Sequence, residues 1–274
     1  MILLKFILSK INIFLETFFL IEIKKKVFPI FINKNYKIPL IIYQSWHTNF
    51  MPRSLAREIN KFRKLNPDVK FYLYNDSEVK NYMKKFYGKH QIYEIFKKAK
   101  YWQIKTDIFR YCILFERGGF WLDIKSIINV QLSKILSKDV TMVWSFEKNK
   151  FKSTDNHNIK SKLLYKNNFI CNWFLGSQKK NIILKNVINN ICVGFPMFKN
   201  KVFDNPKDAI LEFSGPRLFT NTIRKFFDHN NNKIKIQQAG IDIYGHGHYH
   251  APGTSMLYYV KRHYSLDKSS KIFN

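Results

Sequence analysis

Apolar and polar positions alternate along the chain in a way that predicts strands followed by helices. Residues 40–43 form an apolar run typical of a strand, and Pro52 begins a segment with the apolar spacing of a helix. After the break at Asn66-Pro67, residues 69–74 predict a second strand, and Asp76 precedes another helix. The apolar residues of that helix that we expect to face the core are Val79, Met83 and Phe86. This order predicts a mainly parallel sheet flanked by helices, with a ligand site at the strand ends.

The second half of the chain continues the same alternation. A strand is expected at residues 168–175, a helix at 182–191, and a further helix after Ser214-Gly215-Pro216. The last expected strands are residues 234–236 and 241–244. No internal repeat and no Pro/Gly-rich linker divides the chain, so one α/β domain over residues 36–274 is predicted.

The segment from residue 106 to residue 125 has the clearest chemical pattern. Asp107, Arg110 and Tyr111 are spaced i, i+3 and i+4, so one face of the expected helix carries all three. A Gly-Gly pair then ends the helix, and a short aromatic strand leads to Asp123. Because ligands of open α/β sheets bind at the carboxyl ends of strands, these polar groups should meet in one pocket. Two acids, an arginine and a tyrosine suit a polyhydroxylated, phosphorylated ligand.

Four further motifs accompany this segment, in a fixed order. They are Ile38-Pro39-Leu40-Ile41-Ile42-Tyr43-Gln44-Ser45-Trp46, Asn66-Pro67-Asp68, Tyr72-Leu73-Tyr74-Asn75-Asp76 and Ser214-Gly215-Pro216. Together the five motifs resemble glycosyltransferase family 32, the DXD-motif sugar transferases that include capsular polysaccharide synthesis proteins and mannosyltransferases. More distantly, they resemble the glucosyltransferase domain of large clostridial toxins. The resemblance spans residues 38–265.

That resemblance implies a fold and an activity. The fold would be GT-A-like (Rossmann-like), with a mixed, mainly parallel sheet flanked by helices. The activity would be transfer of a hexose from a nucleotide-diphospho-sugar to a glycan or lipid-linked acceptor, with retention at the anomeric carbon. Such a reaction belongs to the synthesis of cell-surface polysaccharides, such as capsule, or of glycoconjugates.

The resemblance also implies roles for individual residues. The residues expected to bind the donor are Trp46, Asp107, Arg110, Tyr111, Asp123, Ser214, Gly215 and His263. Asp123 and Lys125 would act at the reacting centre. Trp46 can equally be a core residue at the end of its strand. Asp107 and Arg110 can equally be an ordinary ion pair within one helix, which stabilises a helix by only about 0.2–0.5 kcal/mol.

Lys125 departs from the family pattern, because it stands where the second acid of the Asp-x-Asp motif belongs. That acid would bind Mn²⁺ or Mg²⁺, and a lysine cannot, so Asp123 is the one motif acid left for a metal. One hypothesis is that the Lys125 ammonium neutralises the donor diphosphate, making the enzyme metal-independent or weakly metal-dependent. The alternatives are a catalytically degenerate polyanion- or membrane-binding module on the same fold, and a Lys125 that points into solvent. A nucleotide-sugar hydrolase is a rival enzyme.

The net charge of +28 can attract nucleotide-sugars, anionic lipids and nucleic acid alike. Nucleic acid is not an expected partner, because the chain has no zinc or helix-turn-helix signature and no basic run interleaved with aromatic residues. The three cysteines lie in apolar contexts without metal or disulfide spacing. They indicate a reducing compartment, so we expect a cytoplasmic protein.

Residues 1–30 are expected to form an apolar and basic helix. The stretch is interrupted by charges and has no small-residue cleavage site, so neither a membrane span nor a signal peptide is predicted. Followed by Lys24-Lys25-Lys26, such a helix can lie on an anionic membrane, at its cytoplasmic face. The alternative is an ordinary helix packed on the domain.

Alternate histidines occur in the segment His246-Gly247-His248-Tyr249-His250. On a strand they would share a face and could hold zinc. The neighbouring glycines and the lack of a nearby acid favour instead a solvent-exposed or acceptor-binding loop, and the resemblance implies a variable loop over the active site at this point of the chain.

Overall fold

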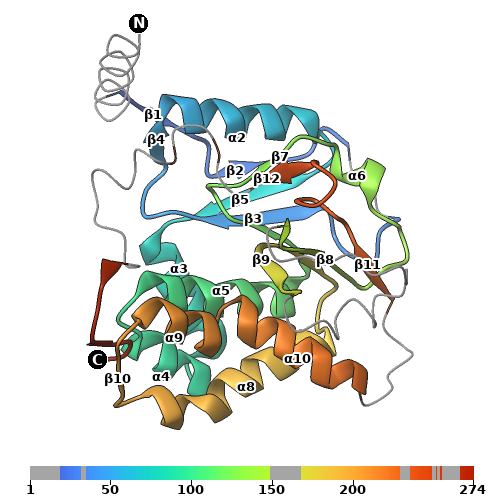
Figure 1. Ribbon diagram of the computed structural model, residues 1–274. Helices are drawn as coiled ribbons and strands as arrows, with labels where there is room; N and C mark the ends of the chain where they lie inside the picture. The colour runs from blue at the N-terminus through green and yellow to red at the C-terminus, as the bar shows by residue number, and fades with distance from the viewer. Residues whose placement is uncertain are drawn as a thin grey trace, which may run out of the picture.

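The computed structural model describes residues 19–31, 35–148, 168–228, 235–248, 251, 254 and 266–274. A seven-stranded sheet crosses the centre of the molecule (Figure 1). Its strands, in spatial order, are β11 (Ile236–Gln238), β8 (Met142–Phe146), β9 (Ile170–Ser177), β6 (Gly119–Leu122), β3 (Ile41–Ser45), β5 (Lys70–Tyr74) and β2 (Lys26–Val27). All run in one direction except β9 and β2, which are antiparallel to their neighbours. The mainly parallel sheet predicted from the sequence is confirmed.

Helices cover both faces of this sheet. Helix α2 (Arg53–Leu65) lies on one face, with the short α6 (Leu132–Ile135) at its end. The other face carries α3 (Asp76–Tyr87), α4 (Gln91–Lys98), α5 (Trp102–Arg117), α8 (Ile182–Phe198), α9 (Pro206–Phe213) and α10 (Pro216–Asp228). The largest apolar cluster lies between these helices and the sheet. Because α5 is in the middle of this layer, all of its residues from Asp107 to Leu114 are buried.

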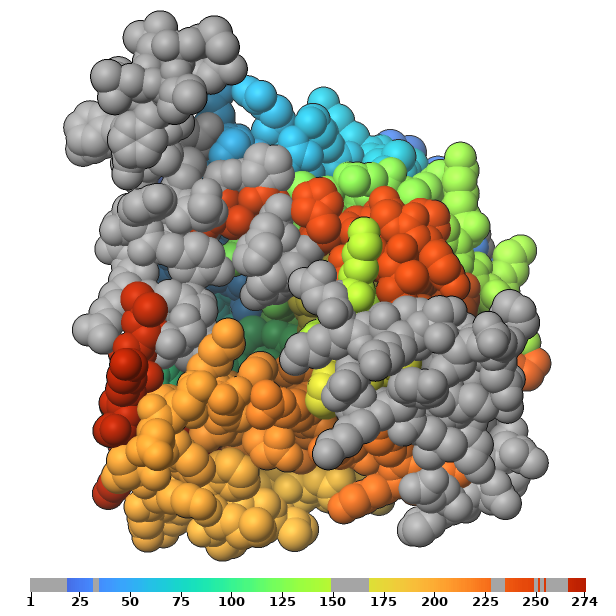
Figure 2. Space-filling model, viewed as in Figure 1, coloured from blue at the N-terminus to red at the C-terminus, as the bar shows by residue number. Residues whose placement is uncertain are grey.

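Three small two-stranded sheets complete the fold. Strand β1 (Leu20–Glu22) pairs with β4 (Phe50–Pro52), and β10 (Val202–Phe203) pairs with β13 (Ser270–Lys271). Strand β12 (Gly247–His248) pairs with β7 (Ile127–Ile128). Figure 2 shows the segment around β12 in orange-red between α2 in blue and α10 in orange.

Two adjacent glycines let α5 turn directly into β6. Gly118 and Gly119 have φ values of 66° and 105°, which other residues rarely adopt. A Cβ on Gly119 would also lie 2.7 Å from the carbonyl oxygen of Ile41 on β3. The pair therefore permits close contact between neighbouring strands, and four residues later β6 ends beside Asp123.

Helix α3 begins differently from the sequence prediction. Its N-cap is Asn75, whose side chain accepts from the Glu78 N–H at 2.9 Å, while the Glu78 carboxylate accepts from the Asn75 N–H at 2.8 Å. Val79 and Met83 are buried as predicted. The prediction for Phe86 is wrong: its side chain is 42% exposed.

Several other boundaries also differ from the predictions. The helix expected at 182–191 continues to Phe198, although Pro196 lies within it. Residues 241–244 form turns rather than a strand, with Gly240 and Gly245 at positive φ on either side. Strand β8 was not predicted, although its five residues are all buried.

The expected helix over residues 1–30 is wrong for residues 20–22 and 26–27, which form β1 and β2. Residues 1–18 lie outside the described residues. Because β2 is an edge strand of the central sheet, the domain begins upstream of the predicted boundary at residue 36. Within the described ranges, no helix is long and apolar enough to cross a membrane.

Candidate functional site

Neighbouring parallel strands end together at one edge of the sheet. Trp46 follows β3, and its N–H donates to the carbonyl oxygen of Tyr74, the last residue of β5, at 3.0 Å. Asp123 follows β6, which pairs in parallel with β3. This is the carboxyl edge at which the sequence places a ligand site.

Asp107, on the buried side of α5, is held by three contacts. Its Oδ1 accepts from Asn172 Nδ2 at 2.9 Å, and its Oδ2 accepts from Ser214 Oγ at 2.9 Å. Arg110 Nη2, one turn along the helix, is 3.4 Å from Oδ1. Asp107 is only 7% exposed, so it fixes β9, α5 and the start of α10 relative to one another.

Arg110 connects this cluster to the strand end. Its Nη2 is 3.0 Å from Asp123 Oδ1, closer than it is to Asp107, and its Nη1 donates to the carbonyl oxygen of Asn172. The guanidinium carbon lies 5.2 Å from the centre of the Trp121 ring, whose Nε1 donates to the same Asp123 oxygen at 2.6 Å. Asp107 and Arg110 therefore form more than an intrahelical ion pair. With Trp121 they set the orientation of the Asp123 carboxylate, which is the more exposed end of the network at 21%.

Tyr111 is completely buried. Its hydroxyl lies 3.0 Å from Asn172 Oδ1 and 2.8 Å from the carbonyl oxygen of Ser214, and its ring stacks on Phe219 at 5.7 Å. The structure therefore places Tyr111 behind the site, where it ties β9 to α10.

Ser214 and Gly215 are also turned inward. Their backbone N–H groups both donate to the carbonyl oxygen of Ile210, at 3.0 and 3.1 Å, and cap the end of α9. These two amides are therefore engaged within the protein, although the resemblance implies that Ser214 and Gly215 bind the donor. Ser214 acts instead through its hydroxyl on Asp107.

Sequence reasoning did not identify Asn172, which contacts Asp107, Arg110 and Tyr111. The signal available was a single amide inside the apolar run of β9, Ile170–Ser177. A buried polar side chain in a strand needs partners, and here they are the motif residues of α5.

Lys125 does not extend away from the strand end into solvent. It is half-buried, and its Nζ lies 5.2 Å from the centre of the Trp46 ring. Burial lowers its pKa, which the nearby Asp123 carboxylate opposes. Trp46 is itself half-buried against a small apolar cluster that includes Ile124 and Ile127. A lysine, a carboxylate and an indole ring thus gather at the ends of β3 and β6.

The histidine-rich segment lies next to this strand end. His248 in β12 pairs with Ile127, and the N–H of Ala251 donates to the carbonyl oxygen of Lys125 at 2.8 Å. The donor-binding residue expected at His263, and the third histidine of the cluster, His250, lie outside the described residues.

Burial raises the pKa of Asp107 to about 7, although Arg110 and the Ser214 hydroxyl both lower it. An unfolded aspartate has a pKa of about 3.9. Between about pH 4 and pH 7, Asp107 therefore binds a proton more tightly in the folded state than in the unfolded state. Wild-type stability relative to Asp107→Asn should therefore fall as pH rises from about 4 to about 7, by up to about 1.4 kcal/mol per pH unit. Urea unfolding at a series of pH values measures this difference.

The control for this prediction is Asp139→Asn. A hydrogen bond from Lys235 lowers the pKa of the exposed Asp139, so its stability contribution should stay constant from about pH 5 to pH 7 and be lost only as pH falls below about 4, the opposite sign. A wild-type minus Asp107→Asn difference that stays constant across this pH range would contradict the predicted shift.

The described residues do not supply the ligand set of a DXD metal site. Hard divalent cations bind oxygen ligands, chiefly carboxylates. Asp123 Oδ1 already accepts from Arg110 and Trp121, and Lys125 stands in place of the second acid. Within the described ranges no three His, Cys, Asp or Glu residues group together to hold a metal ion. Among the described residues, the motif therefore offers a divalent cation one carboxylate, Asp123, in place of two.

Comparisons with known proteins agree with this geometry. Residues 52–142 match the family described as "Glycosyltransferase sugar-binding region containing DXD motif". Inositol phosphoceramide mannosyltransferase 1 of Schizosaccharomyces pombe is 28% identical over 114 residues, 40% of this chain and 35% of the relative. The initiation-specific alpha-1,6-mannosyltransferase of Candida albicans is 23% identical over 222 residues, 73% of this chain and 55% of the relative. The chain thus spans between a third and just over half of these relatives.

Among solved structures, a protein titled PaToxG Glycosyltransferase is similar, with a TM-score of 0.51 and 14% sequence identity. The similarity covers 71% of this chain and 74% of that one. The fold is therefore the mixed α/β, GT-A-like fold of glycosyltransferases. The family match and the mannosyltransferase relatives confirm the resemblance seen in the sequence: over the matched residues the chain is similar to family 32 glycosyltransferases.

Proposed function

We propose that this protein transfers a hexose from a nucleotide-diphospho-sugar to a hydroxyl group of a glycan or lipid-linked acceptor, with retention at the anomeric carbon. The observation that carries the proposal is the fixed Asp123 carboxylate at the end of β6, with Lys125 two residues further on. Because the relatives are named mannosyltransferases, mannose is the first hexose to test. Cell-surface polysaccharide or glycoconjugate synthesis, as in a capsule, would use such a product.

Asp123 suits the recognition of donor hydroxyl groups. Arg110 and Trp121 hold its Oδ1, so the carboxylate is oriented before the ligand arrives. The partly exposed carboxylate can accept hydrogen bonds from a ribose or sugar hydroxyl. The remaining network residues position Asp123 and stay within the protein.

Lys125 suits the diphosphate of the donor. When the glycosidic bond to the donor breaks, negative charge develops on the leaving nucleoside diphosphate. A partly buried ammonium stabilises that charge more strongly than one in open water, because the local dielectric constant is lower. In our proposal Lys125 supplies the positive charge that a metal supplies in a complete DXD motif, so turnover needs no divalent cation. Trp46, in contact with Lys125, would stack on the nucleotide base.

The test is donor turnover. Purified protein with UDP- and GDP-sugars, including GDP-mannose, and with glycan acceptors should release nucleoside diphosphate and form a glycosylated product. Release of free sugar with no glycosylated product would favour the nucleotide-sugar hydrolase. The absence of both saturable donor binding and release would favour the degenerate polyanion- or membrane-binding module.

A lipid-linked acceptor would bring the protein to a membrane, at its cytoplasmic face in our proposal. Residues 19–31 support this, because they expose large apolar side chains beside Lys24-Lys25-Lys26. The exposed residues are Phe19, Leu20, Ile21, Phe28, Ile30 and Phe31. We expect co-sedimentation with anionic vesicles that salt weakens and that Phe28→Ser with Ile30→Ser reduces. Equal sedimentation with neutral vesicles, or no effect of these substitutions, would contradict membrane binding by this segment.

A further inference from the structure

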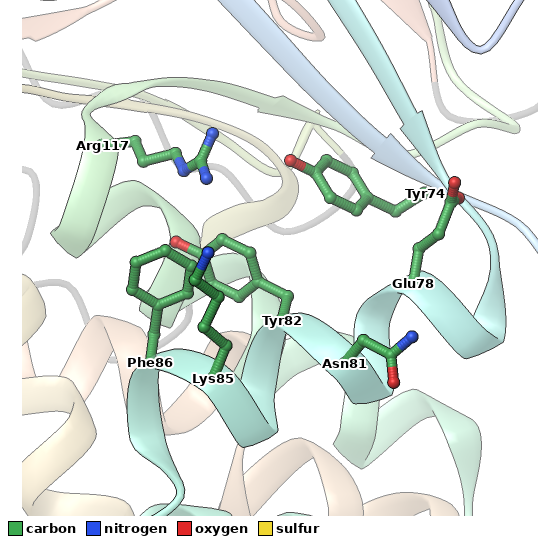
Figure 3. Close-up of a pocket in the computed structure, with 7 residues that line it drawn as sticks. All are labelled: Tyr74, Glu78, Asn81, Tyr82, Lys85, Phe86 and Arg117. Atoms are coloured by element: carbon green, nitrogen blue, oxygen red, sulfur yellow. The ribbon is translucent and has the colours of Figure 1, made fainter.

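A separate pocket lies between helix α3, the end of β5 and the end of α5. Figure 3 shows the side chains that line it: Tyr74, Glu78, Asn81, Tyr82, Lys85, Phe86 and Arg117. It is a shallow pocket, largely open to solvent, with a volume of about 270 Å³, enough for one or two small rings.

None of these lining residues belongs to the Asp107–Arg110–Asp123 network. Arg117 is seven residues beyond Arg110 on the same helix, which is about 10 Å along the helix axis. The pocket is therefore a distinct place in the fold, one or two sugar lengths from the network.

Aromatic rings make up much of the pocket wall. The rings of Tyr82 and Phe86 are 4.5 Å apart, and Tyr74 meets Tyr82 edge-on at 6.2 Å. Phe86 is 42% exposed, so a ligand can cover its face. Such rings bury the apolar C–H face of a sugar while the surrounding polar groups bond to its hydroxyls.

The hydroxyl of Tyr82 is an unusual feature of this wall. Tyr82 is only 6% exposed, and its buried hydroxyl interacts with Arg117, although outside normal hydrogen-bond geometry. In Figure 3 this hydroxyl lies on the side of the ring that faces Arg117. The hydroxyl and the Arg117 guanidinium therefore face the pocket together, where a ligand oxygen can bond to both.

The charges of the pocket favour an anion. Glu78 is already neutralised by Lys25, 3.2 Å away, and accepts the N–H of Asn75. Arg117 and Lys85 form no ion pair with any described residue. The Arg117 guanidinium lies 5.3 Å from the centre of the Tyr82 ring and 5.6 Å from that of Phe86. These rings hold the guanidinium in place, and its donor fork fits a carboxylate or phosphate.

We propose that this pocket binds a sugar ring that carries a carboxylate or phosphate group, as one unit of an acidic glycan acceptor or product. The binding of an acidic sugar follows from the pocket itself. Its role as acceptor or product rests on the proposed glycosyl transfer. Arg117 and Lys85 bind the anionic group, Phe86 and Tyr74 pack on the ring, and Tyr82 bonds to a ring substituent. Such a site would hold a growing acidic chain beside the reacting centre.

Binding to the full chain can be measured by NMR titration with methyl glucuronide, glucose 6-phosphate, methyl glucoside and inorganic phosphate. One of the two acidic sugars should bind saturably, and which one does so identifies the carboxylate or the phosphate. Arg117→Gln should weaken that binding at least about tenfold. Tyr82→Phe keeps the ring and should weaken it about fivefold. The matched control is Lys84→Gln. Like Arg117→Gln it removes one positive charge, but at an exposed position of α3 outside the pocket, so this variant should bind like wild type.

Three results would overturn the proposal. They are equal binding by Arg117→Gln and Lys84→Gln, methyl glucoside binding as tightly as the acidic sugars, and inorganic phosphate binding as tightly as glucose 6-phosphate. Donor turnover on a neutral acceptor separates this inference from the proposed function. Arg117→Gln should leave that turnover unchanged, and a protein without donor turnover can still show the pocket binding.

Discussion

Replacing Arg110 with methionine should lower the free energy of unfolding by about 3–5 kcal/mol. Arg110 is 4% exposed and is the counter-charge of both Asp107 and Asp123. Methionine has a similar length but no charge, so two carboxylates would be left together at a mostly buried place. Asp107 would escape part of this cost by taking up a proton, because burial already raises its pKa to about 7. The loss should therefore be larger at pH 8 than at pH 5, as measured by urea unfolding at both values.

The matched control is Arg217→Met. Arg217 also pairs with two acids, Asp208 at 3.1 Å and Glu212 at 3.9 Å, but all three side chains are about a third to a half exposed. Such surface pairs contribute about 0–1 kcal/mol. An Arg110→Met loss no greater than that of Arg217→Met would show that the network is not the stabilising unit described above. A large loss without pH dependence would contradict the raised pKa of Asp107.

Local pattern predicted much of this arrangement. The i, i+3, i+4 spacing of Asp107, Arg110 and Tyr111 placed them correctly on one face of α5, because helix geometry alone fixes that relation. Asp123 was also placed correctly at a strand end. The strand begins after the Gly-Gly turn and ends with its last apolar residue, Leu122, so the next residue is Asp123.

Partners from distant parts of the chain could not be predicted in the same way. Asn172 reaches the motif because β9 lies antiparallel beside β6, a pairing that no local pattern indicates. The alternation of strands and helices suggested only parallel neighbours. Ser214-Gly215-Pro216 has the sequence pattern of a helix start. However, α9 ends immediately before this motif, and the carbonyl oxygen of Ile210 in α9 accepts hydrogen bonds from the N–H groups of Ser214 and Gly215. Depth of burial was also missed, since Tyr111 has the sequence context of a ligand contact and yet is fully buried.

Lys125 should control both turnover and metal dependence. If its ammonium stabilises the leaving diphosphate, Lys125→Met should reduce nucleoside-diphosphate release about 10²–10³-fold, the usual effect of removing one such stabilising group. Wild-type release should survive EDTA, because Lys125 needs no cation. Lys138→Met, at an exposed lysine away from the strand end, is the control and should turn over like wild type.

The Lys125→Asp variant tests the same role in the opposite direction. It restores two acids at the motif, so release should be low in EDTA and rise when Mn²⁺ is added, while Lys125→Met should not respond to Mn²⁺ because it gains no ligand. Thermal unfolding of each variant checks that it is folded, and Mn²⁺ binding to Lys125→Asp can be followed by calorimetry without any donor. Loss of wild-type release in EDTA together with near-normal release by Lys125→Met would overturn the role given to Lys125. Asp123 would then have to hold a metal through the oxygen that Arg110 and Trp121 leave free, with ligands other than the motif's second position.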